Sequence, residues 1–162
     1  MNQKSLEAKQ AVIKEFSESV KANNSLVIVE YRGVNVADIT TIRRELKEND
    51  AEMIVYKNTL VRRAVDELGH KELDEYLTGP NAFVFSKETI AGPKIIAKHA
   101  RRNEHIVIKG GLIDGRVMTA DQVKAIAKLP GRDGLISMFL SVLEAPIRKF
   151  AATVKAVAEA QN

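Results

Sequence analysis

The sequence predicts an α/β protein with a globular N-terminal domain, in which a βαβ unit and a mixed sheet are flanked by helices, then a hinge and a long C-terminal amphipathic helix. Short β-branched apolar runs alternate with longer segments whose apolar residues recur every three or four positions, as expected for alternating strands and helices. A segment rich in Pro and Gly then interrupts the pattern at 129–134. Beyond it, one apolar stripe continues at helical spacing with no later segment to cover it.

The composition fits one domain with an appendage, or two small domains. Of the 162 residues 45% are apolar, which is enough to build a core. No cysteine is present, so disulfides and thiolate metal sites are excluded. The polar N-terminus lacks the apolar segment of a secretory signal, and no apolar run is long enough to span a membrane. We therefore expect a cytoplasmic protein, and no motif calls for a cofactor.

In the first half of the chain, apolar periodicity defines the βαβ unit and the helices around it. Asn23-Asn24 should end the first helix, and Asn58 should cap the third. The order strand, helix, strand within about 30 residues is typical of a βαβ unit. The predicted elements are a helix at 6–22, a strand at 25–31, a helix at 36–47, a strand at 52–56, a helix at 59–68 and a short helix at 71–77.

In the second half, turn and capping signals separate the elements. Asp114-Gly115 is typical of a hairpin turn, and Thr119 with Gln122 forms a capping box. Ser86 can cap a helix that Gly92-Pro93 should kink or restart. The predicted elements are a turn at 78–80, a strand at 81–85, a helix up to about residue 100, strands at 105–109, 111–113 and 116–118, and a helix at 119–128.

The clearest boundary is the segment from Leu129 to Gly134, because its Pro and two Gly residues interrupt any helix. We expect a globular domain over 1–130, a hinge over 131–134 and a helix over 135–162. That helix would reach about 42 Å, more than the diameter of roughly 36 Å expected for the domain. Its apolar face comprises Ile136, Phe139, Leu140, Leu143, Ile147, Phe150, Val154 and Val157.

An exposed apolar face of this length requires a partner, and two interpretations are open. In the first, the face binds another protein. In the second, the tail folds back as a helical hairpin about Pro146 and covers the face with its own domain. The periodicity alone is compatible with both interpretations.

Basic and polar residues follow both strands of the predicted βαβ unit. Because the carboxyl ends of parallel strands meet at one edge of a sheet, Arg32 and Lys57 should be neighbours. The third helix begins here, and a helix N-terminus offers free N–H groups to an anion. We therefore predict a phosphate-binding surface, called the basic corner below. Its residues are Tyr31, Arg32, Gly33, Lys57, Asn58, Thr59, Arg62 and Arg63.

Motifs for catalysis are absent from the sequence. It contains no phosphate-binding loop, dinucleotide fingerprint or nucleophile elbow. The three histidines are scattered without carboxylates at metal-ligand spacing, and we interpret them as surface or capping residues. Arg43, Arg44 and Lys47 are interleaved with acidic residues, which is typical of a solvent-exposed helix face.

Five short motifs resemble, in order and spacing, those of one protein family. They are Tyr31-Arg32-Gly33, Tyr56 to Thr59, Arg62-Arg63-Ala64, Leu77 to Asn81, and Leu129-Pro130 followed by the terminal helix. The chain is similar to the bacterial stalk-base proteins, the family of the tenth protein of the large ribosomal subunit. The resemblance covers essentially the whole chain.

The resemblance implies a scaffold rather than an enzyme. In this family the globular domain binds large-subunit rRNA beside the eleventh protein of the subunit, and the basic corner matches the motifs that face the rRNA. The C-terminal helix carries dimers of the acidic stalk protein, and these dimers recruit translation GTPases. Family members also repress their own operon by binding leader mRNA. A location in the cytoplasm, on the ribosome, follows from this resemblance.

The length of the terminal helix, compared with family members, implies two dimers of the acidic stalk protein. Pro146 lies near the middle of the helix and should kink it, which would separate two binding sites. We expect Phe139 and Leu143 to anchor one dimer, and Phe150 and Val154 to anchor the other.

Two other functions are compatible with parts of the pattern. A phosphate-binding α/β enzyme could use the terminal helix to form a homodimer, but the sequence offers no convergent titratable residues for its active site. A peripheral membrane protein could place the helix on a lipid surface. The polar face of such helices is usually strongly basic, whereas Arg148, Lys149 and Lys155 are here offset by two glutamates.

Overall fold

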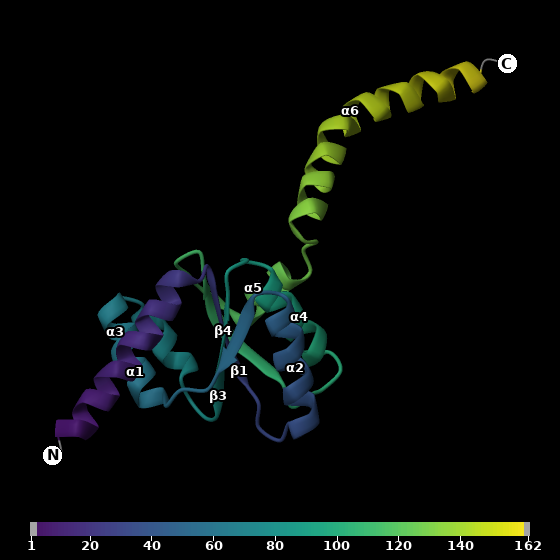
Figure 1. Ribbon diagram of the computed structural model, residues 1–162. Coiled ribbons are helices and arrows are strands. Elements are labelled where there is room, and N and C mark those ends of the chain that lie inside the picture. The colour runs from purple at the N-terminus through teal and green to yellow at the C-terminus, as the bar shows by residue number, and fades with distance from the viewer. Residues whose placement is uncertain (1–2, 161–162) are drawn as a thin grey trace. The chain divides into compact units, whose positions relative to one another are not determined.

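The computed structural model describes residues 3–160, which form two compact units divided between Lys128 and Leu129. The first unit has three layers, with one sheet between two layers of helices (Figure 1). The second unit contains a single long helix. The predicted fold class, a sheet flanked by helices followed by a long C-terminal helix, is confirmed.

The sheet has five strands in the order β2-β3-β1-β4-β5. All four pairs of neighbouring strands are antiparallel. The strands are β1 (Ser25–Glu30), β2 (Ala51–Ile54), β3 (Asn81–Ser86), β4 (Val107–Ile113) and β5 (Arg116–Thr119). The hairpin between β4 and β5 turns at Asp114-Gly115, as predicted, and both turn residues have positive φ.

The predicted βαβ unit is split, because β3 lies between β1 and β2. Both strands run antiparallel to β3, so they point in the same direction without being neighbours. The physical reason is that an interior strand must be buried on both faces, and β3 suits that position better than β2. Every residue of β3 is buried, which suits an interior strand, whereas Glu52 of β2 is exposed, which suits an edge. Arg32 and Lys57 therefore follow strands separated by a third.

Each face of the sheet has its own core. Figure 1 shows α1 (Gln3–Ala22) and α3 (Asn58–Leu68) on one side of the sheet, and α2 (Val36–Glu48) and α4 (Ala91–Ala100) on the other. The short helix η1 (Lys71–Tyr76) belongs to the first side and α5 (Ala120–Ala127) to the second. Because both faces are covered, the interior strands β1 and β3 are almost continuously buried apolar runs rather than alternating ones.

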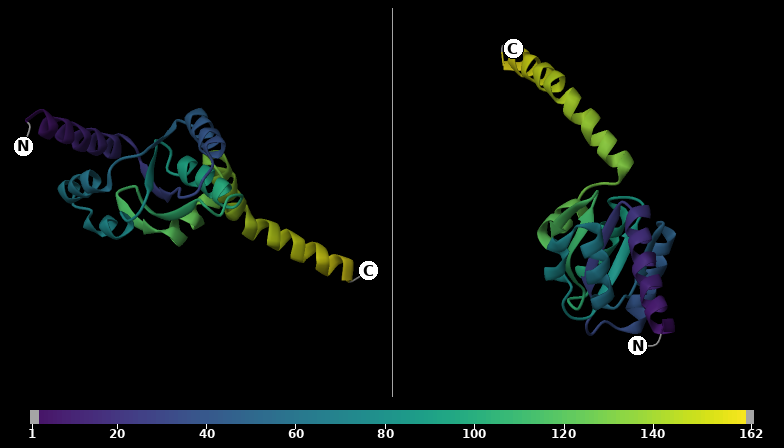
Figure 2. Two further views of the ribbon diagram at one scale, coloured as in Figure 1. Left: turned by 90° about the horizontal axis from the view of Figure 1, so that it is seen from below. Right: turned by 90° about the vertical axis from the view of Figure 1, so that its left-hand side faces the viewer.

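Phe16 is the centre of the core under α1, which lies over the sheet in the right-hand view of Figure 2. Its side chain is 1% exposed. The ring makes edge-to-face contacts with Tyr56, Phe83 and Phe85, at centroid distances of 5.5, 5.5 and 5.7 Å. This aromatic cluster fastens α1 to β3 and to the segment between β2 and α3.

Two predicted helix starts are wrong. Lys57 occupies the cap position of α3, and Asn58 lies inside the helix, where its side chain bonds to a neighbouring turn instead of capping. Ser86 is the last residue of β3, and α4 begins only at Ala91. Pro93 then falls in the first turn of α4, where the missing N–H has no helical partner to lose. The capping box of Thr119 and Gln122 is confirmed.

A partly buried polar contact joins α2 to α4, and it includes His99, which is buried rather than at the surface as predicted from the sequence. Glu45 accepts hydrogen bonds from His99 Nε2 at 3.1 Å and from Lys98 Nζ at 3.2 Å. The hydrogen bond from His99, followed by that from Lys98, holds the pKa of Glu45 below its ordinary value of 4.5. The contact therefore stabilises the fold above the unfolded pKa of Glu45, and this stabilisation is lost as pH falls through the lower folded pKa.

We expect Glu45→Gln to lower the free energy of unfolding most at neutral pH, and the difference from the unmodified chain to shrink below pH 4.5. Urea unfolding of both proteins between neutral pH and pH 3 measures this. Glu48→Gln is the matched control, because Glu48 is exposed and forms no ion pair among the described residues. A pH dependence that is the same in all three proteins would show that the contact does not stabilise the fold.

The second unit is the helix α6 (Arg132–Ala160). It begins earlier than predicted, so most of the expected hinge lies in its first turn. Gly134 explains this start, because a Cβ there would lie 2.6 Å from Cβ of Pro130. The helix continues through Pro146 as a single element that bends near its middle (Figure 1), so the helical hairpin about Pro146 does not form. No helix among the described residues is long and apolar enough to cross a membrane.

Candidate functional site

The basic corner is built where β1 and β2 end and where β3 begins. Arg32 and Gly33 follow β1 and are exposed, and Tyr31 beside them is half-buried. Lys57 and Thr59 are exposed at the start of α3. Because β3 separates β1 from β2, the turn that precedes β3 lies between the two groups of residues.

This turn, Thr78 to Pro80, is held from both sides. Asn58 Nδ2 donates a hydrogen bond to the carbonyl oxygen of Gly79 at 2.8 Å. On the other side, Lys109 Nζ donates to the carbonyl oxygen of Thr78 and lies 2.7 Å from Glu30 Oε2. Asn58 and Lys109 therefore position the backbone of the corner.

Gly33 fixes the shape of the turn after β1. Its φ of +85° belongs to the left-handed region that favours glycine. A Cβ at this position would lie 3.1 Å from Nδ1 of His105, so the imidazole ring packs directly against the turn. The amide of Val34 donates to the carbonyl oxygen of Tyr31 at 3.2 Å and closes the turn. His105, interpreted from sequence as a surface or capping residue, therefore supports the corner.

The cations of the corner differ in whether they form hydrogen bonds or ion pairs with other groups of the protein. Arg62 reaches the carbonyl oxygen of Leu77 at 3.5 Å and Asp74 Oδ1 at 3.9 Å, which directs it toward η1. Among the described residues, no ion pair within 4.0 Å involves Arg32, Lys57 or Arg63. These three exposed cations are available to an external anion, whereas Arg62 is partly neutralised.

A small hollow beside the start of α3 brings a further cation to the corner. It has a volume of about 290 Å³. Lys9 of α1 lines it together with Lys57 and Arg63, and no acidic residue lines it. The remaining lining residues are Gln10, Ile13, Thr59 and Leu60. Lys9 was not predicted as a site residue, because only the packing of α1 on α3 brings it here.

Tyr56 precedes the corner and has a structural role. Its ring belongs to the aromatic cluster around Phe16, and its hydroxyl donates to Glu15 Oε1 of α1 at 3.0 Å. Burial, together with this hydrogen bond, raises the pKa of Tyr56 to about 12. The phenol therefore stays neutral at physiological pH and ties the segment before α3 to α1.

The second candidate site is the apolar face of α6. Its eight predicted residues are 52–74% exposed, and Ile147 and Phe150 are the most exposed of them at 72% and 74%. Met138 and Val142 are also exposed but lie outside the predicted face. The first half of α6 is therefore apolar over a wider arc than the second. On the polar side, Arg148 pairs with Glu144 at 2.6 Å and Lys155 with Glu159 at 3.7 Å.

The described residues contain no group of three His, Cys, Asp or Glu side chains that could hold a metal ion. The arrangement therefore offers two candidate binding surfaces of different chemistry. One is a cationic corner suited to phosphate groups, and the other is an apolar helix face suited to a protein groove.

Comparison with known proteins gives matches along the chain. The sequence profile described as ribosomal protein L10 matches residues 4–101, and that of the ribosomal protein uL10 C-terminal region matches residues 129–162. The large ribosomal subunit protein uL10 of Macrococcus caseolyticus is 52% identical, over 100% of this chain and 95% of that protein. Proteins of the same name from Shouchella clausii and Bacillus licheniformis are 50% and 47% identical, over 96% and 95% of this chain and 95% and 93% of their own lengths.

Proposed function

This chain belongs to the ribosomal protein L10 family of the large ribosomal subunit, and from that premise we propose that it forms the base of the ribosomal stalk. It is a ribosomal protein, and its place is therefore the ribosome in the cytoplasm. The proposal concerns its role there, which is that of a scaffold with one surface for RNA and another for protein. The observation that carries it is the exposed apolar face of α6 in a chain of this family.

The first unit is proposed to anchor the protein on large-subunit rRNA through the basic corner. Arg32, Lys57 and Arg63 supply exposed cations, and Lys9 adds another beside them. Tyr31, Gly33, Asn58, Thr59 and Arg62 complete the proposed surface by shaping its backbone or lying along it. Contacts of this kind read the shape of the phosphate backbone more than base sequence.

We expect replacement of both Lys57 and Arg63 by alanine to weaken binding of a stalk-base rRNA fragment roughly tenfold and to reduce the salt dependence of log K by about 2. Two lost phosphate contacts would account for such a change in slope. Fluorescence anisotropy over a series of salt concentrations measures both quantities. The matched control replaces Lys87 and Arg116, which are exposed at the opposite end of the sheet, next to Ser86 and opposite Ile113. An equal loss in the control would mean diffuse attraction and would contradict the assignment of the corner.

The apolar face of α6 is proposed to carry two dimers of the acidic stalk protein, which in turn recruit translation GTPases. Exposed side chains at helical spacing support a helix-in-groove contact. Pro146 divides the helix into two parts, with Phe139 and Leu143 in the first and Phe150 and Val154 in the second. We assign one dimer to each part. The segment from Leu129 to Gly131, which precedes the helix, is left as the proposed hinge.

Two further contacts belong to the same proposal. The first unit would lie beside the eleventh protein of the large subunit, and the rRNA-binding surface would also bind leader mRNA when the protein represses its own operon. Both rest on the family resemblance together with the cationic corner. Neither role requires catalysis.

A further inference from the structure

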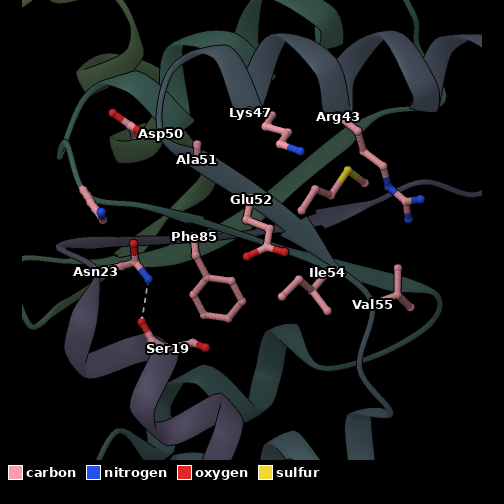
Figure 3. Close-up of a pocket in the computed structure, with 12 residues that line it drawn as sticks. Ser19, Asn23, Arg43, Lys47, Asp50, Ala51, Glu52, Ile54, Val55 and Phe85 are labelled. Atoms are coloured by element: carbon pink, nitrogen blue, oxygen red, sulfur yellow. Dashed lines mark hydrogen bonds between the residues drawn. The ribbon is translucent and has the colours of Figure 1, made fainter.

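The outer edge of β2 is open. This strand pairs with β3 on one side, and no described strand pairs with it on the other. Backbone N–H and C=O groups that point away from β3 are therefore unpaired along this edge, as in any edge strand. Figure 3 shows a hollow along the edge, between α1 and α2, and its volume is about 860 Å³. All four residues of β2 line this hollow, although Ala51 and Met53 are themselves buried.

The wall formed by α2 is cationic. Arg43 and Lys47 are one helical turn apart, and both are exposed and line the hollow (Figure 3). Among the described residues, neither forms an ion pair within 4.0 Å. Arg44, between them in sequence, does not line the hollow. The helix face that was predicted to be exposed therefore presents two cations, Arg43 and Lys47, to the hollow beside β2.

The opposite side of the hollow carries apolar side chains together with Glu52 and with Ser19 and Asn23 of α1. Ile54 and Phe85 pack with the core under α1, and Glu52 lies between them in Figure 3. Side chains alternate along β2, so Ala51 and Met53 belong instead to the core under α2. The two sides of the open edge therefore differ in chemistry, and a strand added here would have different side chains on its two faces.

We propose that the open edge of β2 binds an extended acidic segment of a partner protein as an added strand. Two acidic residues two positions apart in the segment are about 7 Å apart, and one turn of α2 separates Arg43 from Lys47 by about 6 Å. Carboxylates at that spacing match both cations. The residue between them faces Ile54 and Phe85 and is apolar.

A peptide fits this site better than a nucleic acid. Glu52 lies beside Ile54 and Phe85 on the α1 side of the edge, where it would repel a phosphate backbone, whereas the proposed strand presents an apolar residue to that side and its carboxylates to α2. A polynucleotide would leave the unpaired backbone groups of β2 unused, whereas a peptide strand pairs with them. The site lies apart from the basic corner and shares no residue with it.

The test uses the full chain and the labelled peptide acetyl-Thr-Val-Glu-Val-Glu-Val-Thr-amide. We expect binding, with slower hydrogen exchange at residues 51–54. Arg43→Glu should weaken binding by about tenfold, whereas the matched control Arg44→Glu should change it less than about twofold. Both substitutions are at exposed helix positions, and thermal unfolding checks that both variants stay folded.

Peptides N-methylated at alternate residues test the added strand itself. One peptide is N-methylated at its two Glu residues and the other at its three Val residues. Only every second N–H of an added strand faces β2, so methylation of one of these two sets should abolish binding and methylation of the other should not. Absence of binding, equal binding of both methylated peptides, or equal loss from Arg43→Glu and Arg44→Glu would overturn the proposal. An RNA oligonucleotide that displaces the peptide and depends on Arg43 in the same way would also overturn it.

Discussion

A chain ended at Gly131 is expected to bind no copy of the acidic stalk protein, whereas the full chain is expected to bind four copies as two dimers. The truncation removes α6 and with it the whole exposed apolar face, while the described core of the first unit lies within residues 13–123. Native mass spectrometry after co-expression with the acidic stalk protein measures the number of copies directly. This is the largest binding effect that we predict, because it changes the stoichiometry from two dimers to none.

Single substitutions test whether each half of α6 binds one dimer. Phe150→Asp should remove one dimer and leave the other, because a buried charge in one groove does not reach the half before Pro146. Lys149→Asp is the matched control, because Lys149 is adjacent, exposed and outside the apolar face. Loss of neither dimer from Phe150→Asp would refute the assignment of its site. A full chain that binds no copies would refute the proposed role of α6.

Phe16→Ala is expected to have the largest effect on folding, with a loss of about 3–5 kcal/mol in the free energy of unfolding. The side chain is 1% exposed and contacts three aromatic rings, so its removal leaves a cavity that the sheet and α1 cannot readily close. Such a loss is a large part of the stability of a typical domain. Urea unfolding followed by circular dichroism measures the difference.

Phe150→Ala provides the matched control for that measurement. The same side-chain atoms are removed, but Phe150 is 74% exposed on α6, so the expected change in unfolding free energy is within about 0.5 kcal/mol. A loss below about 1 kcal/mol for Phe16→Ala would contradict the view that the aromatic cluster holds α1 on the sheet.

Local sequence signals predicted the type and order of the elements but not the order of the strands. Apolar periodicity and β-branched runs are properties of neighbouring residues, and they placed β1, α2 and β2 within a few positions of their observed bounds. The position of β3 between β1 and β2 depends on which strand can be buried on both faces. Glu52 could have predicted the edge position of β2, because a charged residue within a short strand favours an edge.

The candidate sites also combine residues that local sequence signals predict with residues that only the tertiary structure brings together. Arg32, Lys57 and Arg63 were found because they follow strands or begin a helix, which is a local feature. Lys9 and His105 join the corner only through packing of distant segments, and no sequence signal indicated them. Asn58 has a side chain typical of a cap, but the carbonyl oxygen of Gly79 lies 2.8 Å away and competes for it. Tertiary contacts decided these cases.

The position of β1 in the middle of the sheet has a consequence for synthesis of the chain. Ser25 pairs with Ser86 and with Ile113, so this early strand cannot complete its ladder until about 90 further residues have been made. At typical elongation rates that interval lasts roughly 4 to 18 s. During it, the apolar residues of β1 are without their final neighbours, and high contact order slows the closing step. Nascent chains of this protein should therefore engage a holding chaperone until β4 has left the exit tunnel.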